Sequence, residues 1–188
     1  IGSHTDTIEI TPNVWDLIPP TIQRSTGGTD LMFYSFFFRE YKKQKLRFFA
    51  NSLYIKKGYN SLDEKFGDYT SVSLFASKTF FRKWGLTTQL KVERISQLQA
   101  KQSKLLELVV RDQYYGLPNF LDKQKSTGSK KWLFIPQLSY SQNGITVFAI
   151  SEIPLCQYLN GKQIGSEQQF TFGLTYRFLT KECEPEIK

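Results

Sequence analysis

The chain has 188 residues, of which 40 % are hydrophobic and 15 % aromatic, and its formal net charge at pH 7 is +8. It contains no apolar run near the roughly 18–20 residues that a membrane-spanning helix needs, which excludes a helical membrane protein. A membrane-spanning β-strand needs only about 9–11 residues that alternate apolar with polar, so a β-barrel remains compatible with the composition.

Period-two alternation is the dominant pattern of the chain, and it predicts β-strands. It is clearest near the C-terminus, where every second residue from Phe170 to Phe178 is apolar and the residues between them are small or polar. Seven such segments follow one another, each about twice as long as the ~5–6 residues that ordinary strands average. In chain order they cover residues 29–41, 45–56, 67–80, 85–96, 130–141, 144–155 and 167–178.

The connections between these segments alternate in length. Short turns at 42–45, 81–84 and 142–144 alternate with longer stretches at 57–66, 97–129 and 156–166. Asn143-Gly144 predicts a type I′ hairpin, because both positions of that turn need positive φ. Outer-membrane barrels show this alternation, with short periplasmic turns and long outer loops. We therefore expect an all-β fold: an antiparallel up-and-down transmembrane β-barrel of which seven or eight long strands are visible.

The pattern divides the chain into three regions. They are an N-terminal loop segment with at most one strand end (1–28), the barrel strands with a long outer loop at 97–129 (29–178), and a polar tail (179–188). Bacterial barrels use an even number of strands, so seven do not close one. Either an eighth strand lies near residues 4–11, or further strands precede Ile1, and we expect the second arrangement.

The long stretch at 97–129 is compatible with two structures. Its apolar residues Leu98, Leu105, Leu108 and Val109 fit one face of a short helix. They fit equally well an extension of the hairpin beyond the membrane.

Several motifs resemble one family of outer-membrane barrels. They are the Gly-rich loop and strand in 17–38, the Phe-Gly-Asp strand start at 66–68, the Ile-Pro-Leu element at 153–155, the NGKQIG loop at 160–165 and the GLTYRF segment at 173–178. Over residues 18–178 the chain resembles the closing strands of the transporter-like outer-membrane barrels grouped with the phenol-degradation meta-pathway proteins. The resemblance implies a channel or transporter and names no substrate. Such barrels carry more strands before this region and commonly stop at the terminal aromatic residue, whereas residues 179–188 follow it here.

Aromatic residues near the strand ends are candidates for the girdles that mark membrane interfaces. We expect Trp84 and Trp132 on the short-turn side, and Tyr54, Tyr69 and Tyr158 on the long-loop side. The alternative is a set of ordinary core aromatics.

The last strand carries Phe172, Tyr176 and Phe178, which resemble the signal read by the barrel-assembly machinery. The alternative is a plain amphipathic closing strand.

Four charged residues fall on the polar sides of their strands and are candidates for the lumen: Arg47, Lys91, Glu93 and Arg177. An excess of Arg and Lys in a lumen favours anions. The alternative is a ladder of cross-strand ion pairs that fills the interior.

Other basic side chains fall at the short-turn end in this assignment: Lys42, Lys43, Lys45, Arg82, Lys83, Lys130 and Lys131. Because they are spread over every turn, they indicate solvated charge or contact with anionic headgroups, and we expect no nucleic-acid partner.

Little in the sequence supports catalysis, and we expect no enzyme activity, no cofactor and no metal. Outer-membrane hydrolases and proteases need a histidine base beside Ser or Asp, and the single histidine, His4, is badly placed for this role because it lies in the N-terminal segment. GxSxG, Walker, HExxH and zinc-ligand spacings are absent. Cys156 and Cys183 fall at opposite ends of the spans in this topology, so we expect no disulfide between them.

These observations favour a barrel of the Gram-negative bacterial outer membrane that acts as a passive channel or transporter for small solutes. Its expected partners are membrane lipid, lipopolysaccharide and the barrel-assembly machinery. Two alternatives stay open. One is a structural barrel that anchors an envelope assembly and binds a protein through the 97–129 loop. The other is a soluble lipocalin-like binder of an apolar ligand, in which Phe170, Phe172, Leu174 and Tyr176 would point inward and not towards lipid.

Overall fold

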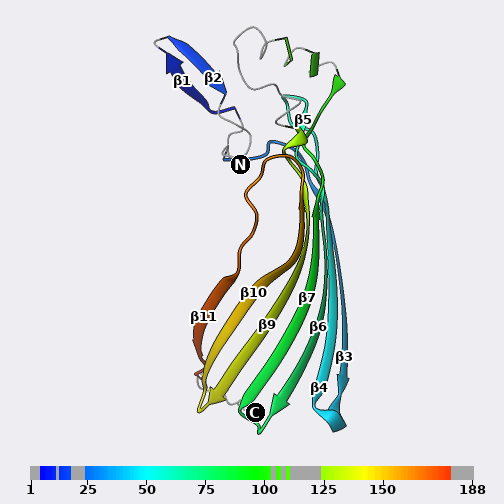
Figure 1. Ribbon diagram of the computed structural model, residues 1–188, viewed down its shortest axis with the longest axis vertical. Coiled ribbons are helices and arrows are strands. Elements are labelled where there is room, and N and C mark those ends of the chain that lie inside the picture. Colours follow the sequence, from blue (N-terminus) through cyan, green and yellow to red (C-terminus); the bar gives the residue numbers. More distant parts are fainter. Residues whose placement is uncertain are drawn as a thin grey trace, which may run out of the picture.

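The described part of the protein is mostly antiparallel β-sheet. The computed structural model describes residues 5–11, 13–17, 24–102, 105–106, 109–110 and 124–178. Its largest element is an antiparallel sheet of seven strands (Figure 1). These are β3 (Leu31–Tyr41), β4 (Leu46–Lys56), β6 (Tyr69–Phe80), β7 (Trp84–Ile95), β9 (Ser129–Gln142), β10 (Ile145–Leu159) and β11 (Gln169–Tyr176). No helix in the described residues combines the length and the apolar composition that crossing a membrane requires.

The strand order is β11-β10-β9-β7-β6-β4-β3, so the large sheet is a meander in which each long strand pairs with the next long strand along the chain. All six pairings are antiparallel. The all-β antiparallel class is confirmed, and each strand begins within two residues of its predicted segment. Within the described residues, β3 and β11 each pair along one edge only, so the sheet is open and not a closed barrel.

The N-terminal segment differs from its prediction as a loop with at most one strand end. Here β1 (Thr7–Thr11) and β2 (Val14–Leu17) form a separate hairpin. Asn13 turns the chain with a φ of 66°, a left-handed conformation that Asn tolerates better than most residues. Its N–H donates to Glu9 Oε1 at 2.8 Å, which fixes the turn. A second small pairing joins β5 (Glu64–Lys65) to β8 (Gln99–Ala100).

The connections of the large sheet are sorted by length between its two ends (Figure 1). The short-turn end holds the 3-10 turn Lys42–Gln44, the turn at 81–83 and the Asn143-Gly144 hairpin. The loop end holds the longer connections 57–68, 96–128 and 160–168. Asn143 and Gly144 have φ values of 50° and 79°, so the predicted positive-φ hairpin is confirmed.

The two faces of the sheet differ in both chemistry and exposure, and β6 shows the contrast within four residues. Val72 and Leu74 are 44 % and 58 % exposed, whereas the intervening Ser71 and Ser73 are 6 % and 3 % exposed. Leu133 is the one buried large hydrophobic residue in the part of the chain that the structure describes. We call the side carrying Val72 and Leu74 the apolar face, and the side carrying Ser71 and Ser73 the polar face. The usual relation between burial and hydrophobicity is therefore reversed in the centre of the sheet.

Candidate functional site

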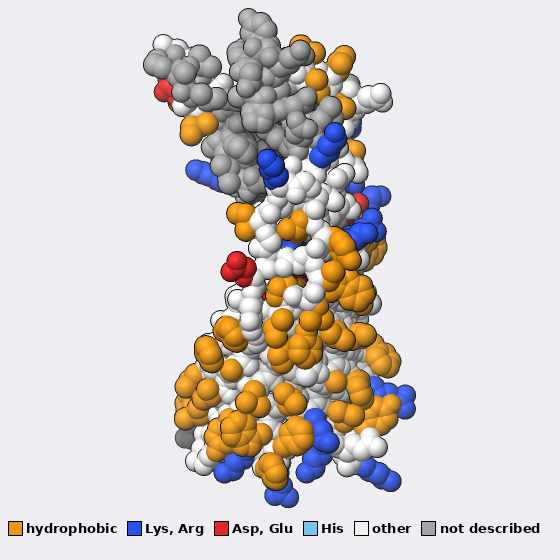
Figure 2. Space-filling model, in the orientation of Figure 1, with side chains coloured by type: hydrophobic (Ala, Val, Ile, Leu, Met, Phe, Trp, Pro, Cys, Tyr) orange, Lys and Arg blue, Asp and Glu red, His pale blue; other side chains and the backbone are white. Residues whose placement is uncertain are grey.

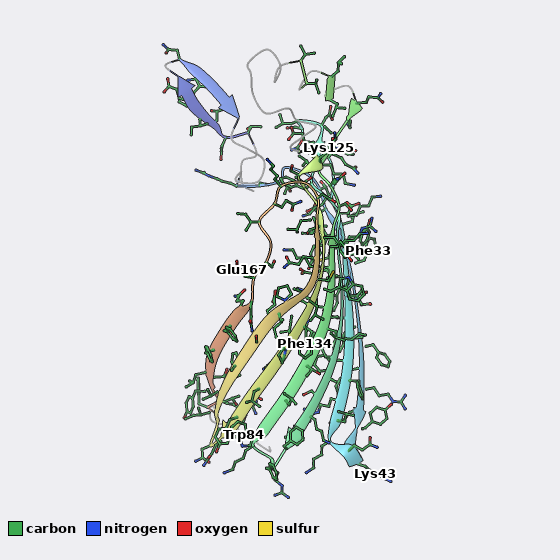
Figure 3. The ribbon with its side chains drawn as sticks, viewed as in Figure 1. Phe33, Lys43, Trp84, Lys125, Phe134 and Glu167 are labelled. Carbon is green, nitrogen blue, oxygen red and sulfur yellow. The ribbon has the colours of Figure 1, made fainter. Side chains whose placement is uncertain are left out.

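The apolar face is built from rows of cross-strand neighbours, because residues that pair across antiparallel strands point to the same side. One row crosses Leu74 of β6, Leu90 of β7 and Phe134 of β9. Leu74 and Leu90 are 58 % and 50 % exposed, although they lie at the centre of the sheet. Figure 2 shows hydrophobic side chains gathered over the lower half of the sheet, and Figure 3 places Phe134 near its middle.

Three hydroxyl groups on the apolar face, those of Ser35, Ser52 and Thr88, have hydrogen-bond partners within the sheet. Ser35 Oγ and Ser52 Oγ lie 2.9 Å apart across β3 and β4. Thr88 Oγ1 donates to the Ala76 carbonyl at 3.4 Å. A hydroxyl without such a partner is costly where water is absent, so these contacts suit a face that meets an apolar medium.

Cations border the apolar face at both ends. At the loop end, Arg94 pairs in register with Lys130. At the short-turn end, Arg39 lies 5.5 Å from the centre of the Tyr41 ring, and the Lys78 ammonium lies 5.3 Å from the centre of a neighbouring phenylalanine ring. The long stems of these residues can lie along apolar surface while their charges reach water.

The predicted aromatic girdles are partly rearranged. Trp84 begins β7 at the short-turn end and packs on Tyr140, with ring centres 4.9 Å apart. Trp132 instead lies at the loop end, opposite Val92, because β9 runs antiparallel to β7 and starts from the long connection. The same direction places Lys130 and Lys131 at the loop end, so their assignment to the short-turn end is wrong.

The three tyrosines expected at the loop end do lie there, but they do not share a face. Tyr54 and Tyr158 are on the apolar face, 38 % and 63 % exposed. Tyr69 is on the polar face, where its hydroxyl donates to Glu93 Oε1 at 2.7 Å. Tyr69 therefore does not belong to a girdle on the apolar face, since its position has the same parity along β6 as Ser71.

The polar face carries a hydrogen-bonded cluster centred on β7. Lys91 Nζ lies 2.6 Å from Glu93 Oε1, and Gln89 Nε2 donates to Ser73 Oγ at 3.1 Å. The side chains of Lys91 and Glu93 are 27 % and 20 % exposed, so the pair is largely shielded from solvent. Lys131, opposite Glu93 in register, donates to Ser166 Oγ at 2.7 Å. Each of these charged side chains is thus hydrogen-bonded, and Lys91 is paired with a carboxylate.

The other charged lumen candidates differ in their surroundings. Arg47 lies on the polar face, opposite Ser77, and its Nε donates to Glu40 at 2.9 Å. Arg177 follows β11, and its backbone N–H donates to the Gly144 carbonyl at 2.7 Å at the short-turn end. The structure therefore does not bring Arg177 into the Lys91–Glu93 cluster.

An aromatic cluster on the polar face was not predicted. Phe49 of β4 stacks on Phe75 of β6 with ring centres 4.4 Å apart, and Phe36 of β3 lies 6.5 Å from Phe49. Phe36 and Phe38 are 57 % and 51 % exposed. The sequence feature that could have predicted this cluster is the FYSFFF run in β3. This run lacks alternation and so places large aromatic residues on both faces. The polar face therefore carries an aromatic cluster on β3, β4 and β6 beside the hydrogen-bonded cluster centred on β7.

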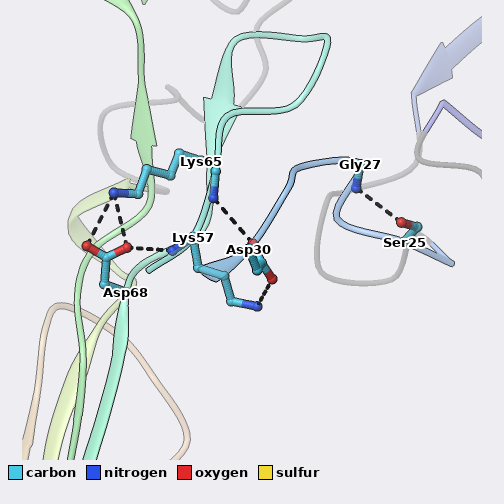
Figure 4. Close-up of polar contacts among 7 residues, drawn as sticks. Ser25, Gly27, Asp30, Lys57, Lys65 and Asp68 are labelled. Carbon is cyan, nitrogen blue, oxygen red and sulfur yellow. Dashed lines mark hydrogen bonds and ion pairs between the residues drawn. The ribbon is translucent and has the colours of Figure 1, made fainter. Parts of the chain in front are cut away.

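Ion pairs tie the connections together at the loop end (Figure 4). Lys57 Nζ lies 2.6 Å from Asp30 Oδ2, and its backbone N–H donates to Asp68 at 2.8 Å. Lys65 Nζ lies 3.1 Å from Asp68. Burial acts to raise the pKa of Asp68, but the Lys57 N–H and the Lys65 ammonium outweigh it and hold the pKa below its ordinary value. Gly67 lies where a Cβ would overlap the Ser96 carbonyl, so the backbones of these connections pass in close contact.

The remaining site candidates lie near or beyond the strand ends. Phe172, Tyr176 and Phe178 are 78 %, 61 % and 69 % exposed, and the last two rings stack with centres 6.1 Å apart. Cys156 is a free thiol near the loop end of β10. His4 and Cys183 lie outside the described residues. In the 97–129 segment, the Leu105 N–H donates to the Lys101 carbonyl with helical spacing, and most of the rest lies outside the described residues.

The described residues contain no group of three or more His, Cys, Asp or Glu side chains that could hold a metal ion. Comparisons with protein-family models, with curated proteins and with solved structures find no match. The arguments for function therefore rest on the two faces of the sheet.

Proposed function

We propose that this chain forms part of the wall of an outer-membrane β-barrel that acts as a passive channel or transporter for small solutes. The observation that carries the proposal is the exposed apolar face over seven strands, set against an opposite face that has shielded serines and a paired Lys91 and Glu93 at its centre. In water such a face is an interaction or aggregation liability, whereas in a bilayer it is solvated by lipid. The motifs that resemble the transporter-like barrels support the same proposal.

The strand dimensions fit a bilayer. A strand of about 12 residues, such as β7, extends ~40 Å at ~3.3 Å per residue. At the tilt of about 45° found in membrane barrels, it crosses ~28 Å, close to the hydrocarbon thickness of about 30 Å. The cations Arg94 and Lys130 at the loop end, and Arg39 and Lys78 at the short-turn end, have long stems along which their charges can extend towards the two interfaces.

A barrel requires both edges of the sheet to be paired, because unpaired backbone groups are costly in lipid. The unpaired backbone N–H and C=O groups of β3 and β11 are available for that pairing. These two strands can pair with each other or with further strands. On the polar face, β3 carries the exposed rings of Phe36 and Phe38. Closure of the barrel would cover these rings.

In the proposed barrel, the polar face lines the lumen. Because Lys91 is paired with Glu93 and Arg47 with Glu40, the wall supplies little net charge, and we expect weak selectivity between anions and cations. The aromatic cluster around Phe49 and Phe75 favours a second candidate function. If these rings fill the interior, the barrel is structural and anchors an envelope assembly.

Membrane fractionation of the native protein, followed by gel mobility with and without boiling, tests the proposal. We expect extraction only by detergent and a folded band that shifts on boiling. Conductance in a planar bilayer then separates the two candidates, since an open channel conducts and a filled structural barrel does not. A detergent-free soluble monomer would contradict the membrane assignment and favour a soluble binder of an apolar ligand.

A further inference from the structure

Within the described residues, the short-turn end carries a concentration of positive charge. Across residues 39–47, 78–86 and 138–147, Glu40 is the only carboxylate, and its side chain binds Arg47. We use the name basic rim for the exposed side chains of the two basic turns at this end: Lys42, Lys43, Lys45, Arg82 and Lys83. Figure 2 shows Lys and Arg side chains below the hydrophobic surface, and Figure 3 places Lys43 at this end.

Three cations of the loop end have carboxylate partners, whereas Lys56, Arg94 and Lys130 at the same end form no ion pair within the described residues. Lys57 and Lys101 lie 2.6 Å from Asp30 and Asp63 respectively, and Lys65 has its own carboxylate partner. Within the part of the chain that the structure describes, no carboxylate forms an ion pair with a member of the basic rim. The charge of the basic rim is therefore available to a partner outside the sheet.

The turn at 81–83 has residues that are unusual for its backbone conformation. Phe81 and Arg82 have φ values of 47° and 58°, and the Lys83 N–H donates to the Phe80 carbonyl at 3.2 Å. The neighbouring hairpin turns the chain with Asn-Gly, which adopts positive φ at little cost, whereas a bulky residue such as Phe adopts it rarely. Phe81 is also 90 % exposed. The turn thus holds an exposed ring and a cation side by side at a conformational cost, which points to a role outside the fold.

The basic rim lies just beyond the last aromatic row of the apolar face. Trp84 and Tyr140 form that row at the short-turn end, and Trp84 follows the turn directly. In a bilayer, Trp and Tyr lie at headgroup level, and Lys or Arg beyond them reach the lipid phosphates.

Resting on the proposed membrane function, we infer that the basic rim binds the headgroups of anionic phospholipids in the leaflet that it faces, with Phe81 inserted among them. Charge complementarity selects this partner, since juxtamembrane Lys and Arg are attracted to anionic lipid surfaces. Contact with the apolar face also places the rim at the lipid surface.

Trp84 supplies a local probe for the test. The full chain, with Trp15→Phe and Trp132→Phe, is reconstituted into vesicles of phosphatidylcholine mixed with phosphatidylglycerol. Bromine on the chains of one lipid or the other quenches Trp84 in proportion to the local amount of that lipid. We expect the brominated phosphatidylglycerol to be enriched around Trp84 by about five-fold at low salt, and less at high salt.

Two variants locate the effect. Changing all five residues of the basic rim to Gln should reduce the enrichment to about one-fold, and the smaller Arg82→Gln, Lys83→Gln variant should reduce it in part. A matched loop-end variant, Lys56→Gln with Arg94→Gln and Lys130→Gln, should leave it unchanged. Two results would overturn the inference about the headgroups and leave the proposed membrane function standing. One is equal quenching by both lipids in the parent protein, and the other is enrichment that survives the substitutions in the basic rim. A protein that enters neither kind of vesicle, and whose Trp84 neither lipid quenches, would overturn the proposed membrane function as well.

Discussion

The two faces of β6 and β7 are made by the same strands, yet apolar side chains are exposed on one face and polar side chains are shielded on the other. On one side, Leu74 and Leu90 pair across the strands and remain about half exposed. On the other side, Ser73 pairs with Lys91 and is almost completely shielded. In the proposed barrel, lipid solvates the apolar face, whereas the polar face satisfies its groups by internal hydrogen bonds. Substitutions that exchange the properties of the two faces test that difference.

The largest effect is expected from a charge placed at the centre of the apolar face. Leu90→Arg should destabilise the folded protein in a bilayer by about 2–4 kcal/mol, the cost of Arg at the bilayer midplane on the lipid side of a barrel. The adjacent Gln89→Arg on the polar face is the matched control and should cost much less. Urea unfolding in lipid vesicles measures both. Equal costs for the two variants would contradict the assignment of the faces.

A smaller effect is expected from breaking the shielded pair on the polar face. Glu93→Gln removes the negative charge that lies 2.6 Å from the Lys91 ammonium and should cost about 1–3 kcal/mol. In a conducting barrel it should also shift ion selectivity towards anions. Glu40→Gln in the more exposed pair with Arg47 is the control, with an expected cost below about 1 kcal/mol. Unchanged selectivity in a conducting Glu93→Gln protein would argue against Lys91 facing the ion path.

The serine pair on the apolar face sharpens the comparison further. Ser35→Ala leaves the Ser52 hydroxyl without its 2.9 Å partner and should cost about 1 kcal/mol. The double variant Ser35→Ala, Ser52→Ala should recover most of that loss, because neither hydroxyl is then left unpaired in lipid. Unfolding free energies in vesicles give the coupling. Full additivity of the two substitutions would indicate that water reaches this position.

The smallest effect lies outside both faces, at the loop end. The pKa of Asp68 is held below its ordinary value of 3.8, so the carboxylate stabilises the fold fully above that value. This contribution is lost as the pH falls from about 4 through the lower folded pKa. Asp68→Asn should therefore lower stability at neutral pH by less than about 1 kcal/mol and flatten the acid limb of the pH profile. Thermal unfolding of both proteins from neutral to acid pH measures the change.

The strands were predictable because period-two alternation over long segments is typical of β-strands and incompatible with a helix, and each strand began within two residues of its expected start. The face of Tyr69 was predictable as well, from its parity with Ser71 along β6. The place of Trp132 followed from the direction of β9, which starts at the long connection. In contrast, the Phe49–Phe75 contact depends on the register between strands, and the β1–β2 hairpin on a single left-handed Asn. Local sequence does not encode the register, and a lone Asn is a weaker turn signal than the Asn-Gly pair at 143–144.

The most direct test of the central claim is a nitroxide scan along residues 86–92 of β7 in lipid vesicles. Each position is labelled in turn on a Cys156→Ser, Cys183→Ser background, and its accessibility to dissolved oxygen and to a water-soluble nickel chelate is measured. The account predicts period-two alternation in which labels at positions 86, 88, 90 and 92 meet the lipid-soluble oxygen. Labels at 87, 89 and 91 should be shielded from it. Alternation of the opposite phase, or labels at all positions open to the aqueous reagent, would contradict a membrane-facing apolar surface.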